Sequence, residues 1–521
     1  MRIIYSCPGA MLQVYYDLHQ ELSKRFNIED VGFYVSEKQY FDNFCKANPE
    51  FTSNYKYLAE WEVLDKISDQ YDIEKLSSYQ KKYFSEYSMW YSMVADRRIF
   101  LGKYTKIKQD HQPSYSYEQM MSLLENSIVM TEDFFEQIKP DIVVGLTSAT
   151  FGDHIIFGMA ESLGIRFMNL RHTKLKNYMT YTVGLDEKYS HVSKMCELLE
   201  KQAVEVKANV NEEVESYISA AQSGKVAYSG HRKFEMKWQS LLPGMITDGL
   251  RALLVDVKYL GKEKDHHTKA LRTQLFLQDR LFRVVRLFHQ EHKFKSIYKS
   301  IGDVSERKYI FFPMHAEPEV SLSVMAKNYQ NQIEVVRNIA MQLPIEYKLL
   351  VKDHPRNLGR RSTKYLQKVL QIPNVDLVEP SANSIDIIRQ CDMSIILSGF
   401  VGFEAVLQKK PVITLGKTML SLLPDGMVKH VSNITDLRVE MLNILKNYEY
   451  DHRALHNYLY SIMSQSVPID LMSVLLRKKG REGKLYTKEL YEQNITNLAN
   501  NLIQRIDNGS TGTEGFLHAE Y

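Results

Sequence analysis

The chain is built from a repeated unit in which a short apolar run is followed by a turn bearing Gly or Pro and then by a segment with helical spacing. In the first third, such apolar runs occupy residues 2–6, 30–36 and 140–146, and another follows at 165–170. Strands that alternate with helices are typical of a parallel sheet covered by helices. The amino-terminal part is therefore predicted to form a Rossmann-like domain.

The same unit returns in the second half of the chain. Apolar runs at 308–315, 347–352, 374–378, 392–399 and 411–416 alternate with helical patterns at 331–343, 360–372, 384–391 and 403–407. Five strands separated by helices predict a second Rossmann-like domain. Two such domains facing a cleft, with helical insertions and carboxy-terminal helices, give an α/β fold of GT-B-like architecture.

A length of 521 residues exceeds one ordinary hydrophobic core, so several parts are expected. We predict the following division: a first Rossmann-like domain over 1–205 with a helical insertion at about 50–136, a mainly helical basic connecting segment over 206–304, a second Rossmann-like domain over 305–440, helices over 441–506, and a flexible tail over 507–521.

Composition excludes several classes of protein. The 66 basic and 63 acidic residues nearly balance, so no overall charge favours nucleic acid. The four cysteines are scattered, which fits a reducing compartment and predicts neither a zinc site nor a disulfide framework. No apolar stretch reaches the roughly 18 to 20 residues of a spanning helix. The start of the chain reads as strand, turn and helix rather than as a signal peptide, and a cytoplasmic location is expected.

The connecting segment alternates apolar and basic residues at helical spacing. Such a helix can lie on an anionic membrane surface, which would make the protein peripheral at the inner face of the cell membrane. The same pattern also describes a helix that packs on its own protein with its charges in water, which is commoner. His266 and His267 are adjacent, so they point in different directions on a helix and receive no ligand role.

Charged residues follow directly after the buried strand at 347–352, in the stretch "KDHPR". Lys352, His354 and Arg356 supply cations and donors at the carboxyl edge of the sheet, where ligands of open α/β folds bind. Pro355 would fix the turn that aims His354 inward. In the alternative interpretation, the stretch is an ordinary turn with solvated charges.

Two further polar clusters follow strand ends of the same domain. The stretch "MHAEPE" contributes His315, Glu317 and Glu319. In "LSGFVGFEAV", Ser398, Gly399 and Gly402 could let backbone N–H groups approach a phosphate, and Glu404 could accept bonds from a ribose. Each cluster alone also suits turns and helix starts. Three clusters at neighbouring strand ends favour a nucleotide site.

The ordered motifs "FPMHAEPEVSLS", "NYQNQ", "YKLLVKDHPRNLGRR" and "IPNVDLVEPSANSIDIIRQCDMSIILSGFVGFEAVLQKKPVITLG" resemble the capsular polysaccharide biosynthesis proteins, a grouping that includes bacterial Kdo transferases. The resemblance is close over residues 308–417. Asp96-Arg97-Arg98 and "PDIVVGLTSATFGDHIIFGMAESLGI" are similar to the amino-terminal half of these proteins, more loosely.

The resemblance implies a glycosyltransferase of the hexosyl- or Kdo-transferase type, with the second domain binding the nucleotide-sugar donor and the first the acceptor. It assigns His354, Pro355 and Ser398 to the nucleotide phosphate, with Lys352 beside them. The implied donor is CMP-Kdo or a similar CMP-sugar acid, and the implied acceptor is a capsular or surface polysaccharide or its lipid-linked precursor. This chain has Phe400 where the family usually has a hydroxyl.

Transfer also needs a group that accepts a proton from the acceptor. The candidates are Glu317 and Glu319 in the second domain and Asp153 and His154 at a helix start in the first. No metal-binding signature stands out, so a metal-independent reaction without a further cofactor is expected. A non-hydrolysing nucleotide-sugar epimerase and a non-enzymatic glycan-binding or scaffold subunit remain as alternatives.

Overall fold

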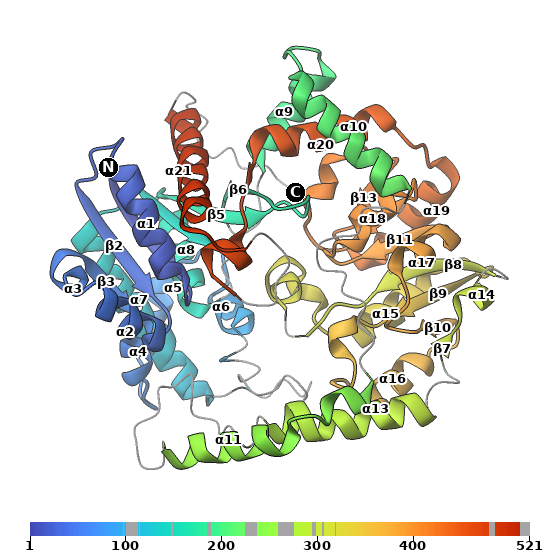
Figure 1. Cartoon of the computed structure of the whole chain (residues 1–521), viewed down its shortest axis with the longest axis horizontal. Helices are drawn as coiled ribbons and strands as arrows, with labels where there is room; N and C mark the ends of the chain where they lie inside the picture. The colour runs from blue at the N-terminus through green and yellow to red at the C-terminus, as the bar shows by residue number, and fades with distance from the viewer. Residues whose placement is uncertain are drawn as a thin grey trace.

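The computed structural model describes residues 1–96, 98–99, 113, 115–146, 150–184, 189–223, 237–258, 273, 276–293, 298–304, 307–317, 319–478 and 485–510. These residues form two lobes, each built on a sheet of seven strands (Figure 1). Both sheets are dominated by parallel pairs, so the α/β class with two Rossmann-like, GT-B-like lobes is confirmed. No helix among the described residues is long and apolar enough to cross a membrane.

The first sheet has the order β14-β6-β5-β4-β1-β2-β3. Its strands are β1 (Arg2–Cys7), β2 (Asp30–Val35), β3 (Lys56–Ala59), β4 (Ile142–Leu146), β5 (Arg166–His172), β6 (Tyr178–Val183) and β14 (Val467–Pro468). β6 pairs antiparallel with both β5 and β14, and all other neighbouring strands of this sheet pair parallel. The central strand β1 is almost entirely buried, as expected of a strand covered by helices on both faces.

The second sheet has the order β13-β12-β11-β8-β9-β10-β7 and is parallel throughout. Its strands are β7 (Tyr298–Lys299), β8 (Lys308–Pro313), β9 (Tyr347–Lys352), β10 (Val375–Val378), β11 (Met393–Ile396), β12 (Val412–Thr414) and β13 (Val428–His430). The chain runs from β8 outward to β9 and β10, then returns to place β11 on the other side of β8. The strand order therefore reverses between β8 and β11, which makes this a topological switch point.

Helices cover both sheets. In the first lobe they are α1 (Met11–Ser23), α2 (Lys38–Ala47), α3 (Phe51–Asn54), α4 (Glu60–Asp65), α5 (Ile73–Tyr83), α6 (Met89–Ala95), α7 (Tyr117–Ile138), α8 (Phe151–Ser162), the π-helix η9 (Leu471–Leu475) and α21 (Lys488–Ser510). In the second lobe they are α9 (Ser190–Glu200), α10 (Ala208–Gln222), α14 (Ile301–Val304), α15 (Gln332–Gln342), α16 (Thr363–Leu370), α17 (Ser384–Gln390), α18 (Val401–Leu407), α19 (Leu437–Asn447) and α20 (His452–Gln465).

Short helical turns complete the second lobe, and a helical strap runs along the lower edge of the molecule in Figure 1. The turns are η4 (Ser321–Met325), η5 (Lys327–Tyr329), η6 (Pro355–Asn357), η7 (Met419–Leu422) and η8 (Ile434–Asp436). The strap consists of η1 (Trp238–Leu241), α11 (Met245–Lys258), the π-helix η2 (Leu277–Leu281) and α13 (Phe282–Lys293).

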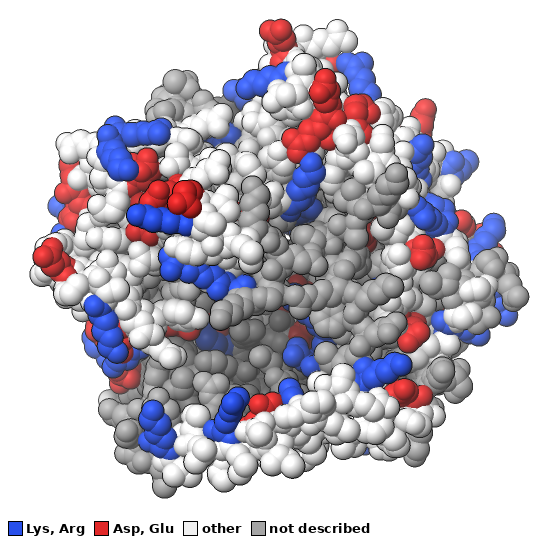
Figure 2. Space-filling model, in the orientation of Figure 1, with Lys and Arg blue, Asp and Glu red and all other residues white. Residues whose placement is uncertain are grey.

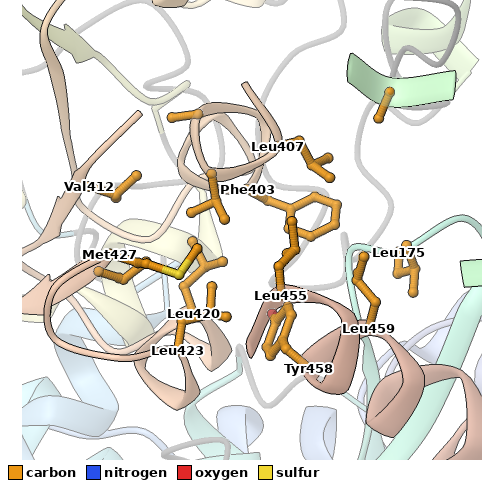
Figure 3. Close-up of a cluster of buried hydrophobic side chains, with 14 of the residues drawn as sticks. Leu175, Phe403, Leu407, Val412, Leu420, Leu423, Met427, Leu455, Tyr458 and Leu459 are labelled. Carbon is orange, nitrogen blue, oxygen red and sulfur yellow. The ribbon is translucent and has the colours of Figure 1, made fainter. Parts of the chain in front are cut away.

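The hydrophobic cores show which helices belong to which lobe. Buried residues of α9 and α10 share one cluster with the second sheet and with α20, and Leu175 of the first lobe joins this cluster (Figure 3). Residues of α21 instead pack into a cluster under β1 and β2. The expected boundary at residue 205 would place α9 in the first domain and α10 in the next segment. In the structure, both helices pack into the core of the second lobe. The chain also returns to the first lobe at its carboxy-terminal end.

Five strands lie in segments where no strand was expected. β3 falls inside the expected helical insertion, β7 inside the expected helical connecting segment, and β14 among the expected terminal helices. β6 and β13 were likewise not expected. These strands are two to six residues long, and each lies at or next to an edge of its sheet. Their pairing is decided by neighbouring strands rather than by a strong local apolar run.

Candidate functional site

Three adjacent strands of the second sheet end in polar residues. β11, β8 and β9 are neighbours in that order, and their carboxyl ends lead into Ser398, His315 and His354 respectively. The order of strands in the sheet therefore confirms that the three polar clusters follow neighbouring strands. The clusters also flank the switch point between β8 and β11, where open α/β sheets bind ligands.

Lys352 and His354 form the centre of this edge. The Lys352 Nζ lies 2.8 Å from the Ser384 Oγ, and the side chain is buried. Burial lowers the pKa of Lys352 to about 8, and the nearby charge of Glu404 opposes this shift. The ammonium group is therefore charged at neutral pH but easily titrated.

The imidazole of His354 has a defined orientation. Its Nδ1 accepts a hydrogen bond of 3.1 Å from the backbone N–H of Arg356. His354 thereby caps the start of η6, whose first residues are Pro355 and Arg356. Burial lowers the pKa of His354 to about 4, and the charge of Glu319 opposes the shift. A neutral ring whose Nδ1 accepts a bond carries its proton on Nε2. His354 can therefore donate one hydrogen bond to an anion, and the exposed Arg356 side chain adds a cation beside it.

His315 and Glu319 approach this centre from the end of β8. The His315 Nδ1 lies 3.4 Å from the Glu319 Oε2. Burial alone would raise the pKa of Glu319, but the hydrogen bond from His315 and the nearby charge of Arg356 hold it below its ordinary value. The other edge of the His315 ring faces Gly399, where an added Cβ would lie 3.3 Å from the His315 Nε2. His315 thus bridges two of the three strand ends.

A buried arginine holds the loop after β9 in place. The Arg361 guanidinium contacts the Asp353 Oδ1 at 2.6 Å and the Glu317 Oε1 at 3.0 Å, and it donates to the His315 carbonyl at 3.1 Å. Gln332 also donates to Glu317. Glu317, a predicted catalytic base, is therefore held in a structural ion pair, whereas Glu319 two residues later reaches the histidines. Arg361 lies eight residues after Asp353 in the sequence, and this spacing alone does not indicate that the two side chains meet.

The segment after β11 combines packing and polar contacts. The Ser398 Oγ donates to the Ser321 carbonyl at 3.1 Å, so its hydroxyl is already bonded. A Cβ at Gly402 would lie 2.3 Å from the Ile396 Cδ1, so this glycine is required for the packing of α18 on β11. Phe400 lies against Phe403 with ring centroids 5.5 Å apart. Glu404 is buried in α18, close enough to Lys352 to influence its pKa.

The two first-lobe candidates, Asp153 and His154, are buried at the start of α8. Asp153 forms a capping box with Thr150, in which the Thr150 backbone N–H donates to the Asp153 Oδ2 at 3.2 Å, and it also accepts a bond from the Ser6 hydroxyl. Burial raises the pKa of Asp153, opposed by these hydrogen bonds. The His154 Nδ1 bonds to the Tyr87 hydroxyl, and the two rings stack. These contacts give both residues structural roles.

A different part of the first lobe reaches the second-lobe strand ends. β5 ends at His172, and the Lys174 Nζ donates a bond of 2.6 Å to the Ser398 carbonyl. His172 and Lys174 line a pocket together with Gly399 and Phe403 of the second lobe. Lys174 has a φ of 66°, an unusual conformation for a residue with a side chain. Burial lowers the pKa of His172 to about 4, and the charge of Lys174 adds to the shift.

Sequence reasoning missed His172 and Lys174, although a usable signal is present. The stretch "RHTK" follows an apolar strand, as "KDHPR" does. The pair Asp96 and Arg98 lies elsewhere, in a buried network in which Arg98 contacts Asp96 at 2.5 Å and Glu60 at 2.7 Å. Arg97, His266 and His267 lie outside the described residues. Among the described residues, no group of three or more His, Cys, Asp or Glu side chains is placed to hold a metal ion.

Comparison with known proteins gives one family and several distant folds. The sequence model of the capsule polysaccharide biosynthesis proteins matches residues 252–424. No curated protein sequence matches the chain. Among solved structures, the β-Kdo 2,7 transferase of KpsC from Thermosulfurimonas dismutans is similar at 11% identity and a TM-score of 0.32, covering 75% of this chain and 88% of that chain. The UDP-GlcNAc 2-epimerase of Neisseria meningitidis is similar at 14% identity and a TM-score of 0.27, covering 89% and 99%.

The matched segment contains every second-lobe residue of the site, from His315 to Glu404. The first lobe, including His172 and Lys174, lies outside it. The resemblance to the capsule polysaccharide biosynthesis family is thus confirmed for residues 252–424, the part of the chain that carries the strand-end site.

Proposed function

We propose that the chain is a glycosyltransferase that moves a sugar from a nucleotide-sugar donor to a capsular or surface polysaccharide or to its lipid-linked precursor. The donor we propose is CMP-Kdo or a similar CMP-sugar acid. The observation that carries the proposal is the convergence of Lys352, His354 and His315 at the switch point of the second sheet, inside the segment that matches the capsule family.

The chemistry of this edge suits a phosphate leaving group. Departure of the nucleotide places negative charge on its phosphate, and preorganised cations and donors stabilise that charge most effectively where water is excluded. In the proposal, the His354 Nε2–H donates to a phosphate oxygen while Lys352 and Arg356 supply positive charge. These groups belong to the protein, so the proposed reaction proceeds without a metal ion.

The acceptor hydroxyl must lose a proton as the new bond forms. His315 is the best-placed base, because Glu319 bonds to its Nδ1 and leaves Nε2 directed toward Gly399. In this arrangement Glu319 orients the ring. The acceptor would enter from the side of His172 and Lys174, the first-lobe residues that line the shared pocket.

The test is incubation of the purified chain with CMP-Kdo, CMP-sialic acid and UDP-sugars, with and without a capsular oligosaccharide acceptor, in the presence of a chelator. Acceptor-dependent release of CMP from CMP-Kdo is the expected result. Conversion of a UDP-sugar to its isomer without acceptor would make the chain an epimerase. Failure to turn over any donor, with retained glycan binding, would leave it a binding subunit.

A further inference from the structure

The helix α11 exposes apolar side chains on the face that points away from the rest of the protein. Ile246, Leu250, Leu253, Leu254 and Val257 repeat at helical spacing along this face, and Ile246 and Leu254 are 80% and 66% exposed. The side of the helix that contacts the neighbouring segment carries Gly249 and Asp256. A Cβ at Gly249 would lie 3.2 Å from the Phe276 ring, and Asp256 accepts a bond of 2.6 Å from the Thr273 hydroxyl.

This arrangement reverses the usual polarity of a surface helix, which buries its apolar face and exposes its polar one. The neighbouring segment has the same polarity. Its exposed residues, again at helical spacing, are Leu277, Leu281, Phe282, Val285 and Phe288. Its inward residues Arg283, Leu287 and Gln290 are buried. We call these ten exposed side chains on α11, η2 and α13 the apolar strap face. A continuous exposed apolar surface of this kind is typical of an interaction site.

Charge distinguishes between the partners that such a face could meet. Residues 251–299 contain twelve Lys and Arg and five Asp and Glu, whereas the whole chain has a net charge of only +3. In the sequence, positive charge is therefore concentrated in this segment. Arg251 and Lys258, seven residues apart on α11, are exposed beside the stripe. Figure 2 shows the lower edge of the molecule, where the strap runs, as mainly uncharged with scattered basic and acidic side chains.

We propose that the apolar strap face docks on the surface of a lipid bilayer that contains anionic headgroups. The apolar side chains would enter the boundary between headgroups and acyl chains, with Arg251 and Lys258 at the level of the headgroups. An interfacial helix needs an apolar face and flanking basic residues rather than the length of a spanning helix, and α11 has both features over its 14 residues.

Not all the basic residues of the strap serve this contact. The Arg283 Nε donates to the Leu358 carbonyl at 2.9 Å, and the Arg286 Nη1 donates to the Arg360 carbonyl at 3.0 Å. Gln290 adds two bonds to the backbone of the same loop, at Gly359 and Arg361. This loop carries Arg361, which holds Asp353 and Glu317 below the candidate site. The docked strap would therefore fix the donor edge relative to the membrane surface.

The experiment is sedimentation of the full chain with vesicles of phosphatidylcholine alone and of phosphatidylcholine mixed with phosphatidylglycerol, at low and high salt, without nucleotide. Leu250→Glu/Leu254→Glu changes two exposed residues of the strap. Val439→Glu/Leu442→Glu is the matched control, because this pair lies exposed on α19 of the second lobe. Circular dichroism and size-exclusion chromatography with light scattering accompany each protein.

We expect the wild-type chain and the α19 variant to bind the anionic vesicles equally. Partitioning of the strap variant should fall at least about tenfold, because charges replace two side chains that would leave water. Absence of wild-type binding, or equal binding by all three folded proteins, would overturn the proposal. So would a wild-type dimer that the strap variant converts to a monomer without any vesicle binding, since the face would then join two copies. Because the readout needs no turnover, it is independent of the proposed transferase activity.

Discussion

Ionisable side chains are arranged differently at the carboxyl edges of the two sheets. At the edge of the second sheet, His315, Lys352 and His354 approach one another from two adjacent strands, and the exposed Arg356 lies beside them. At the edge of the first sheet, Asp153 and His154 turn into the protein and bond to Ser6, Thr150 and Tyr87. A polar residue near a strand end is therefore a candidate ligand only if its side chain faces the cleft.

The second edge also shows how a site is separated from its support. Asp353 and Glu317 lie within two residues of His354 and His315, yet both bind Arg361. The residues that alternate with them remain available for a ligand. The contrast between the two edges predicts that substitutions in the support unfold the protein, that substitutions among the converging residues slow the reaction, and that substitutions at the first edge leave the reaction unchanged.

The largest effect is expected for Arg361→Met. Removing the guanidinium leaves the buried Asp353 carboxylate and the partly buried Glu317 carboxylate without their cation, which costs about 3 to 5 kcal/mol of the free energy of unfolding. Urea denaturation of Arg361→Met and of the exposed control Arg356→Met measures this difference. A loss below about 1 kcal/mol in Arg361→Met would mean that the Asp353 and Glu317 contacts contribute little to the fold.

The next effect is expected for His354→Ala. Loss of one preorganised donor to the leaving phosphate should remove about 2 to 4 kcal/mol of transition-state stabilisation and lower kcat accordingly. His154→Ala is the matched control, because it removes a buried histidine at the corresponding edge of the other sheet. We expect it to lower Tm and to leave the rate of the folded fraction unchanged. The comparison between the edges fails if His154→Ala is the slower of the two folded enzymes.

A smaller effect is expected in the pH dependence of nucleotide binding. Since burial lowers the pKa of Lys352 to about 8, the ammonium group loses its charge above that pH, and affinity should fall by up to about tenfold per pH unit. The stability of the nucleotide-free chain depends on pH in the opposite direction to the nucleotide affinity. Between about 8 and 10.5 the unfolded chain binds a proton that the native lysine lacks, so this residue makes the free energy of unfolding rise with pH.

Calorimetric titration of nucleotide over this pH range checks the prediction, with Lys352→Met as the variant that should lack the alkaline decline. An identical decline in Lys352→Met would assign the titration to another group. His354 and His172, whose pKa values lie at about 4, should contribute no change near pH 6.5.

The central strands could be predicted from sequence because burial on both faces imposes long apolar runs, as in β1, β8 and β9. The edge strands could not. β7 and β14 are two residues long, and β14 joins the first sheet from near the other end of the chain. Nothing local to Val467 and Pro468 indicates that pairing, because it depends on how the chain returns to the first lobe.

The candidate site divides in the same way. The strand-end positions of His315, Lys352, His354 and Ser398 follow from the order of strands and helices, which the sequence pattern indicates. The direction of Arg361 and the reach of Lys174 to the Ser398 carbonyl depend on tertiary packing. Glu317 and Glu319 follow the same strand, and only the partner of each carboxylate, which the sequence does not show, distinguishes them as candidate bases.

The central claim is that the edge of the second sheet, and not that of the first, binds the donor nucleotide. Calorimetric titration of CMP into the wild-type chain, His354→Ala and Asp153→Asn tests it most directly. The account predicts wild-type binding that weakens at least about tenfold in His354→Ala, and an unchanged affinity in Asp153→Asn despite its lower Tm. Unchanged affinity in a folded His354→Ala protein, together with weakened binding in Asp153→Asn, would contradict the account.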